Sequence, residues 1–571
     1  MDIYKRLTGS YPPPENKATA VTSAERLAMG HSYNTMGRSY LDIGKLSVAV
    51  MYFEQAVWLG RQEGSLDLEA SALGHLGLAY FASGYMARAI DFYQEQLAIA
   101  RQTGSRNEEA AALGNLGTSY RYLNQLDKAI AFHDQELNLA QTLQDRYMEA
   151  AALANLGDTY RLQGDRERAV ALYQQALALA RQIEDQIRVR SVLRSMGHIY
   201  GSSGNSKEAL ALFNQSLKIA QKLGDRMGEG ESLSDIANLY QQLGYELEAL
   251  DYHNKALHIA EENSDWRGIA RTLLHVGDLH FDRGNRKEAV VYYQRGLVAA
   301  REIGDQRQEQ QVLARLGQAC FALGDYMESA QLQRRVLQLA QERGDTSAEK
   351  EALLALGQSY EKWGDLGRTA RYYEQYLAIT RQQKDLSGQM LLLERLGDVY
   401  VRSKQYKLAR PLYEQYLVRL RRSGKPPDLI RVMGKLGDVI LALLDAQGAA
   451  DIYELGLEIA REAALPVHEA DLLSRLALAW HHQGRKWRAG RQAEKALSRA
   501  EQTQAPAVLA QVSYRVARLY VLQNKWTKAA PVAQQALHLF VELNNQEMVD
   551  ALQIMVKEID QEKKNSSGFL F

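Results

Sequence analysis

The sequence has little of what would mark a secreted, disulfide-bonded or membrane-spanning protein. Its 571 residues include a single cysteine, Cys320, which excludes a disulfide framework. The first 24 residues contain no apolar run of the length that a signal peptide or a membrane helix requires. The 69 Lys and Arg residues balance 69 Asp and Glu residues, so no overall charge favours binding to nucleic acid. We therefore expect a cytoplasmic protein without membrane insertion.

What the sequence does have is one 40-residue pattern that recurs without gaps. Thirteen copies begin at His31, Ser71, Ala111, Ala151, Ser191, Glu231, Arg271, Gln311, Glu351, Leu391, Arg431, Asp471 and Gln511. The seventh position is Gly in ten copies and Ala at Ala237, Ala477 and Ala517, so only a small side chain is accepted there. The tenth position is aromatic in ten copies. Self-similarity of this kind indicates a repeat array.

The fixed positions predict a pair of helices in each copy. In the third copy, Leu113, Leu116 and Tyr120 form one apolar stripe at helical spacing, and a second stripe begins at Ala129. Asn124 separates the two stripes and is replaced by Gly in nine copies, which is typical of a helix end in the left-handed conformation. We name the two helices A and B. Each pair leaves apolar surface on its flanks, so it must stack on its neighbours.

These positions resemble the tetratricopeptide repeat. The matching residues are LG at positions 6 and 7, Y at 10, G at 14, A at 19, Y or F at 23 and AL near 26 and 27, over roughly 90% of the chain. The 40-residue unit, with N-L-G-x-x-Y followed by G-D-x-x-x-x-A, is similar to the longer repeats of the spindle-adaptor (Pins/LGN-like) family and of bacterial, especially cyanobacterial, arrays. The resemblance implies an all-α right-handed superhelix of about thirteen hairpins whose inner wall consists of A helices.

The pattern divides the chain into four segments. We expect a flexible arm over 1–24, a regular array over 25–423, a less regular and more basic array over 424–550, and a capping helix with a flexible tail over 551–571. Pro426 and Pro427 precede the eleventh copy, where a change of superhelix geometry is expected. Pro411 and Pro531 lie inside B helices and predict kinks there. The apolar residues of the capping helix are Leu552, Met555, Val556 and Ile559.

No group of residues predicts catalysis, a cofactor or a metal. His481 and His482 are adjacent, so on a helix they point about 100° apart and cannot chelate one ion as an i, i+4 pair would. The GEGES run over 228–232 lacks the preceding strand that a phosphate-binding loop needs. Cys320 occupies the tyrosine position of its repeat, which favours a buried core residue over a reactive thiol. We expect a protein that is not an enzyme.

Two sets of A-helix residues are candidates for binding. Positions 5, 8, 11 and 12 vary while the packing positions stay fixed, as expected of either a specialised inner surface or an ordinary solvated one. In the spindle-adaptor-like family, the corresponding asparagine and arginine positions hold an extended peptide, and their side chains suit that role. In copies three and four the candidate peptide-binding residues are Asn115, Thr118, Arg121, Asn155, Asp158 and Arg161.

The second set gives the C-terminal third a basic character. Between Leu391 and Asp550, 23 Lys and Arg residues face 17 Asp and Glu residues. The candidate residues for an acidic partner are Arg395, Arg402, Lys435, Arg475, Arg515 and Arg518. Nucleic acid is not favoured, because the aromatic interleaving of a single-strand platform is missing.

The sequence thus favours a non-catalytic scaffold, adaptor or assembly factor that holds an extended, acidic protein segment in its concave groove. One alternative is a regulatory sensor that closes around a peptide or small ligand and controls a signalling protein. A compact pocket formed by few repeats would favour the sensor. A second alternative is a helical-repeat RNA-binding protein, for which steep salt dependence is expected.

Overall fold

The computed structural model describes residues 22–423 and 425–567, and over these residues it contains 27 α-helices and no strand. The A helices are α2 (Ser23–Asp42), α4 (Leu66–Ala82), α6 (Arg106–Tyr122), α8 (Arg146–Gln163), α10 (Gln186–Ser202), α12 (Arg226–Gln242), α14 (Trp266–Asp282), α16 (Gln306–Leu323), α18 (Thr346–Trp363), α20 (Leu386–Arg402), α22 (Pro426–Ala442), α24 (Pro466–His482) and α26 (Pro506–Leu522).

Each A helix is followed by a B helix, and the two form an antiparallel hairpin. The B helices are α3 (Leu46–Glu63), α5 (Met86–Thr103), α7 (Leu126–Leu143), α9 (Arg166–Gln182), α11 (Ser206–Leu223), α13 (Glu246–Glu262), α15 (Arg286–Glu302), α17 (Tyr326–Arg343), α19 (Leu366–Gln382), α21 (Tyr406–Ser423), α23 (Ala446–Glu462), α25 (Lys486–Gln502) and α27 (Trp526–Glu542). We number the hairpins 1 (α2 and α3) to 13 (α26 and α27). The expected all-α array of thirteen hairpins is confirmed.

The helices begin and end where the repeat pattern predicts. Asp225 accepts a hydrogen bond from the Gly228 amide at 2.8 Å and so caps the N-terminus of α12. All thirteen residues at position 14 adopt the left-handed conformation, including Leu444 with a φ of 66°. The side chain therefore matters less than the backbone at this position, although glycine adopts the conformation at the lowest cost.

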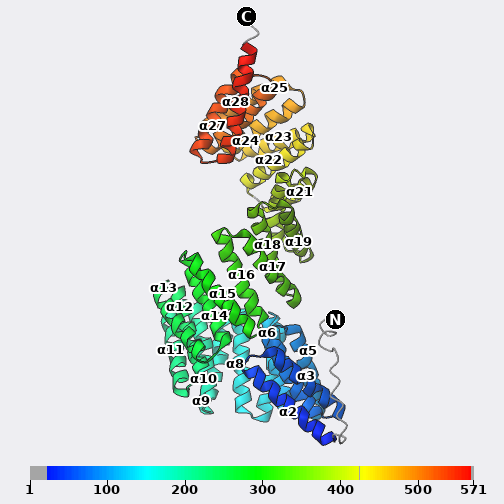
Figure 1. Ribbon diagram of the computed structural model, residues 1–571, viewed down its shortest axis with the longest axis vertical. Helices are drawn as coiled ribbons and strands as arrows, with labels where there is room; N and C mark the ends of the chain where they lie inside the picture. The colour runs from blue at the N-terminus through cyan, green and yellow to red at the C-terminus, as the bar shows by residue number, and fades with distance from the viewer. Residues whose placement is uncertain (1–21, 424, 568–571) are drawn as a thin grey trace. The chain divides into compact units, whose positions relative to one another are not determined.

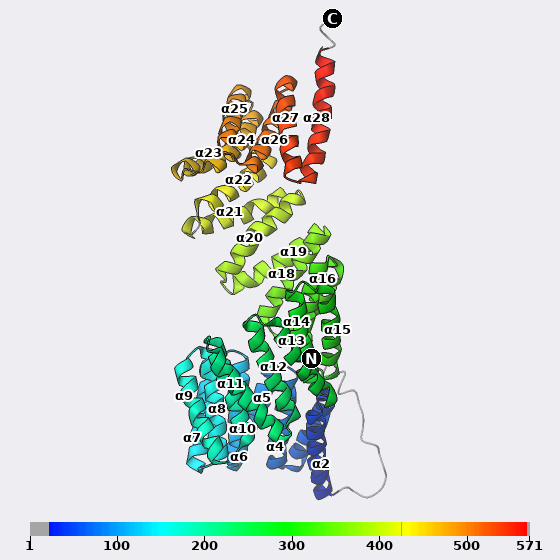
Figure 2. The ribbon, with the colours of Figure 1, turned by 90° about the vertical axis from the view of Figure 1, so that its left-hand side faces the viewer.

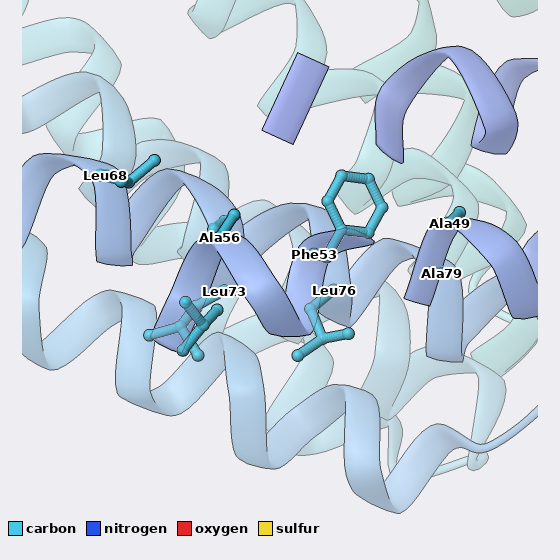
Figure 3. Packing of buried hydrophobic residues seen from close by; sticks show 9 residues of the cluster. Ala49, Phe53, Ala56, Leu68, Leu73, Leu76 and Ala79 are labelled. Atoms are coloured by element: carbon cyan, nitrogen blue, oxygen red, sulfur yellow. The ribbon is translucent and has the colours of Figure 1, made fainter. Parts of the chain in front are cut away.

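The hairpins are held together by a small residue on helix A facing a large one on helix B. A Cβ added at Gly77 would lie 2.5 Å from Cε1 of Tyr93, which is only 1% exposed. Figure 3 shows the adjoining core, where Phe53 of α3 packs with Leu73 and Leu76 of α4. Burial of each such apolar side chain stabilises the fold by about 2 kcal/mol.

The A helices form the inner side of the array. Consecutive A helices contact one another along hairpins 1 to 8, whereas consecutive B helices have no comparable backbone contacts. Figure 1 shows α9 to α13 following one another as a stack of adjacent helices. This arrangement agrees with the superhelix that the resemblance implies.

The chain divides into two compact units within α18. Unit 1 ends at Ala352 and unit 2 begins at Leu353. The expected change of geometry near 424–428 stays a prediction, and residue 424 lies outside the described residues. Pro426 opens α22, while α21 and α27 continue through Pro411 and Pro531 without a break.

A final unpaired helix follows hairpin 13. This helix, α28 (Gln546–Ser567), begins five residues before the predicted capping helix and packs on α27. Leu552 and Ile559 are 0% and 1% exposed. Its start is in register with the preceding A helices, so α28 is the A helix of a fourteenth unit that covers the end of the core. Residues 1–21 of the arm predicted over 1–24, and residues 568–571 of the tail predicted within 551–571, lie outside the described residues.

Unit 1 turns back on itself, so its early hairpins contact its late ones. The amide of Gln306 at the start of α16 donates a hydrogen bond to the hydroxyl of Tyr85 at 2.6 Å. The guanidinium of Arg307 lies 5.2 Å from the ring centre of Tyr122. In Figure 2 the green hairpins around α12 to α15 lie beside the blue hairpins that begin the chain. Loops of hairpins 1 to 3 therefore meet the connections that flank hairpins 7 and 8.

Ile303, at the end of α15, is part of this contact between turns. A Cβ added at Gly44, in the α2–α3 loop, would lie 3.5 Å from Cγ2 of Ile303. Ile303 is only 6% exposed, whereas Leu143 and Leu223, which occupy the same position in other hairpins, are 40% and 46% exposed. The additional burial shows that the loop of hairpin 1 covers this side chain.

Candidate binding surfaces

The inner surface is crossed by polar contacts between consecutive A helices. In unit 1, the Ser195 hydroxyl donates a hydrogen bond to Asp158, 37 residues earlier, at 3.2 Å. Asp278 and Arg315 are related in the same way and lie 3.4 Å apart. The partners occupy position 8 of one copy and position 5 of the next. Many polar side chains on this surface therefore join the repeats to one another.

Three of the predicted peptide-binding residues have partners within the array, and two of them, Arg121 and Asp158, pair across consecutive A helices. The guanidinium of Arg121 lies 3.1 Å from the Asp158 carboxylate, and their side chains are 15% and 25% exposed. The hydroxyl of Tyr173 donates a hydrogen bond to Asp158 at 2.5 Å. Burial, followed by the Asp158 charge, raises the pKa of Tyr173, so the hydroxyl keeps its proton. Asn155 donates a weak hydrogen bond to Glu136 at 3.5 Å.

The other three predicted residues have no such partners. Asn115, Thr118 and Arg161 are half-buried, and within the described residues their side chains form no hydrogen bond or ion pair. They come from α6 and α8, beside the Arg121–Asp158 ion pair. Their donor and acceptor groups are therefore free to pair with an added segment, although their role in binding stays a prediction.

In unit 2, two residues of the predicted basic surface are partly neutralised. The ammonium of Lys435 lies 2.7 Å from both Glu394 and Asp398. The guanidinium of Arg402 lies 2.9 Å from Glu361. These carboxylates come from the preceding A helices, so the positive charge at these positions is shared with the array.

Two further basic residues of unit 2 surround one carboxylate. Arg475 lies 2.8 Å from Asp471 and also pairs with Asp438, and Arg515 pairs with Asp471 from the next A helix. Burial raises the pKa of Asp471, but the charges of Arg475 and Arg515 outweigh this effect and lower the pKa well below its usual range. This network is held ionised at neutral pH.

Arg395 and Arg518 are the more accessible members of the predicted basic set. Both are exposed, and neither forms an ion pair within 22–423 and 425–567. Burial raises the pKa of Tyr373, and the positive charge of nearby Arg395 opposes that rise. Binding of an acidic partner to the six basic residues stays a prediction, and these two are the ones whose charge is most available for it.

The remaining polar groups that the sequence singles out are His481, His482 and Cys320. Among the described residues, no three His, Cys, Asp or Glu side chains are placed to hold a metal ion. The rings of His481 and His482 are steeply inclined, at 76°. Cys320 is 2% exposed, and burial raises the pKa of its thiol to about 12, which agrees with the predicted core position. None of the helices in the described ranges is long and apolar enough to cross a membrane.

A cavity that the repeat pattern does not predict lies between the two turns of unit 1. Its volume is about 830 Å³, within the usual range for small-ligand pockets. One wall comes from the α2–α3 loop and from α4, and the other from α12, the end of α13 and the start of α14. These walls are about 200 residues apart in the sequence, and the repeat pattern does not indicate that they meet.

The array of stacked helical hairpins places this chain in the class of α-solenoid proteins. More specifically, it is a tetratricopeptide repeat protein. The tetratricopeptide repeat models match residues 68–142, 147–222, 228–302 and 30–57, which fall in hairpins 1 to 7. No curated protein matches the chain significantly.

Several solved structures are similar in part, at low identity. BtubC from P. vanneervenii is 20% identical, with a TM-score of 0.34, and the match covers 38% of this chain and 92% of that one. The apo form of RapI is 14% identical, with a TM-score of 0.39, over 48% of this chain and 98% of that one. The Rap conjugation gene regulator of plasmid pLS20, in complex with the Phr* peptide, is 16% identical, with a TM-score of 0.40, over 52% and 80%.

Proposed function

We propose that this protein is a non-catalytic scaffold that holds an extended segment of a partner protein against the A helices of hairpins 3 and 4. The family is consistent with a role in protein interaction or regulation. The observation that carries the proposal is the set of unpaired inner side chains Asn115, Thr118 and Arg161, in a surface where many of their neighbours are paired.

The chemistry of these three side chains suits a peptide. The Asn115 amide offers a donor and an acceptor to a peptide backbone, and the Arg161 guanidinium can bind a carboxylate with two parallel hydrogen bonds. Because Arg121 and Asp158 already pair with each other, they hold the surrounding surface in place without consuming these groups. The preferred segment is therefore extended and carries at least one acidic side chain.

The test uses selected peptides and the full chain. Phage display of random dodecapeptides would supply ligands, and fluorescence anisotropy would give their dissociation constants. We expect acidic sequences that lose at least tenfold in affinity for the Asn115→Ala/Arg161→Gln variant. The matched control is Arg166→Gln, which removes an exposed arginine at the start of α9. Equal affinity for all three proteins would contradict the proposed site.

A regulatory sensor is the second candidate, and the contact between turns favours it. The hydrogen bond between Gln306 and Tyr85 joins hairpins that can separate only if the superhelix of unit 1 opens. A ligand that binds the closed form better would shift unit 1 towards it. Small-angle scattering with and without a selected peptide tests this, because contraction supports the sensor and an unchanged profile supports a passive scaffold.

A further inference from the structure

The cavity between the turns of unit 1 has an apolar interior. Leu78 and Phe81 line it from α4, and Ile259 and Ile303 line it from α13 and the end of α15. Three further large apolar side chains that border it stay exposed to solvent: Ile43 at 60%, Met227 at 62% and Trp266 at 41%. Exposed apolar residues gathered at one concave site are typical of a ligand-binding surface.

Positive charges without partners line the same cavity. Lys45 lies in the α2–α3 loop, while Arg267 and Arg271 lie one turn apart on α14. None of the three forms an ion pair or a side-chain hydrogen bond in the part of the chain that the structure describes, and the Nε atom of Arg271 is buried without a partner. A buried guanidinium atom without an acceptor is unfavourable, so an anionic group there would be stabilising.

Of the four other charged residues of the lining, Arg226 and Glu231 form ion pairs. Arg226 lies 2.7 Å from Glu229. Glu231 pairs with Arg194, and Asp265 accepts a hydrogen bond from the Gly268 amide at 2.9 Å. Asp42 and Asp265 form no ion pair in the part of the chain that the structure describes, so three unpaired cations face two unpaired carboxylates.

We propose that this cavity binds a small amphipathic anion, with an apolar ring system or chain against Leu78, Phe81 and Ile259 and a carboxylate or sulfonate head at Arg267 and Arg271. The site is distinct from the partner surface on hairpins 3 and 4. Because Lys45 belongs to the first turn and the two arginines to the second, the bound ligand would also hold the turns together. Its volume of about 830 Å³ accommodates a molecule of two or three fused or linked rings.

The probe for the test is 8-anilinonaphthalene-1-sulfonate, and N-phenyl-1-naphthylamine is its uncharged counterpart with the same rings. We expect the full chain to bind one sulfonate probe saturably, and the uncharged compound at least tenfold more weakly. The Arg267→Gln/Arg271→Gln variant should bind the sulfonate about tenfold more weakly while its affinity for the uncharged compound stays the same. The Arg166→Gln control should leave both affinities unchanged.

A second variant fills the cavity without changing its charge. A Cβ added at Gly230 would lie 3.7 Å from its nearest neighbour, Ile259, so Gly230→Leu can enter the space without an initial clash. Ala82→Leu extends into the cavity from the opposite wall and replaces the first variant in the test if that variant folds poorly. Both should lose at least tenfold in affinity for the sulfonate probe. Unchanged binding in folded filling variants, or equal binding of both probes to the original chain, would overturn the proposal.

Discussion

Ala237, Ala477 and Ala517 stand where the other ten hairpins have glycine, and the facing residue on helix B changes with them. The B-helix partners are His253, Ala493 and Ala533, each smaller than the Tyr or Phe found opposite most of the glycines. A larger residue on helix A is thus accompanied by a smaller one on helix B, which avoids overpacking at the closest approach of the two helices. An added methyl group on helix A is matched by a smaller side chain on helix B.

This complementarity predicts that His253→Tyr is tolerated only with a glycine opposite. In hairpins with the Gly–Tyr pair, a Cβ added to the glycine would lie as close as 2.1 Å to the ring, as at Gly357 and Tyr373. His253→Tyr alone should cost about 1 to 3 kcal/mol of unfolding free energy through overpacking. The double variant Ala237→Gly/His253→Tyr should recover at least about 1 kcal/mol, despite the helix penalty of glycine. Urea unfolding of the two single variants and the double variant measures this double-mutant cycle. Additive changes in unfolding free energy would contradict the packing argument.

His253 should also make the stability of unit 1 depend on pH. Burial, followed by the charge of His275, lowers the pKa of His253 from 6.5 to about 3. Because the folded value lies below the unfolded one, the stability that neutral His253 contributes is complete above pH 6.5 and is lost as pH falls towards 3. The double variant should therefore lose about 2 kcal/mol less than the original chain between pH 7 and pH 4.5. Identical losses in urea unfolding would show that His253 does not titrate in this way.

In the turn of hairpin 11, the sequence places a leucine in the left-handed backbone conformation, which is unfavourable for a residue with a Cβ atom. Leu444 has a φ of 66° and is 91% exposed, whereas most hairpins place glycine there. Leu444→Gly should stabilise unit 2 by about 1 kcal/mol, because glycine adopts this conformation without the Cβ clash. Leu443→Gly is the control, since Leu443 has a φ of −82° and glycine there should destabilise by about 0.5 to 1 kcal/mol. If the midpoint of thermal unfolding shifts in the same direction for both variants, the prediction is contradicted.

Elements of this kind can be read from the sequence because the information is local. Capping aspartates such as Asp225, the left-handed position 14 and the apolar stripes each act within one hairpin. The polar contacts between A helices also had a signal, because Asp398 and Lys435 carry opposite charges at positions 8 and 5 of consecutive copies. The sequence places Arg121 and Lys435 among the candidate binding residues alongside Arg161, and the pattern within one copy does not indicate that the first two pair with Asp158 and Asp398 of neighbouring copies.

At the scale of the whole array, the contact between turns in unit 1 could not be predicted. Gln306 meets Tyr85 only because small rotations between successive hairpins add up over several repeats. No residue pattern within a 40-residue copy determines this accumulated rotation. The cavity lined by Lys45 and Arg271 depends on the same accumulated rotation. The hairpins can therefore be predicted from the sequence, whereas this cavity cannot.

A disulfide across the contact would test whether unit 1 closes in solution. A Cβ at Gly44 would lie 4.0 Å from Cβ of Ile303, within the range that a disulfide requires. Gly44→Cys/Ile303→Cys should therefore cross-link in a glutathione redox buffer, and the product should migrate differently on a non-reducing gel. The φ of 76° at Gly44 adds a cost of about 1 kcal/mol, and Lys404 tolerates a similar conformation at 58°.

The matched control places the second cysteine at the end of an earlier B helix. In Gly44→Cys/Leu143→Cys the new thiol lies at the same position of hairpin 3, where the native side chain is 40% exposed and not covered by hairpin 1. This pair should stay reduced, and the native Cys320 should not compete because it is buried and its thiol pKa is raised to about 12. If both pairs cross-link at the same rate, the loop of hairpin 1 is not held against α15, and the cavity between the turns loses its closed wall.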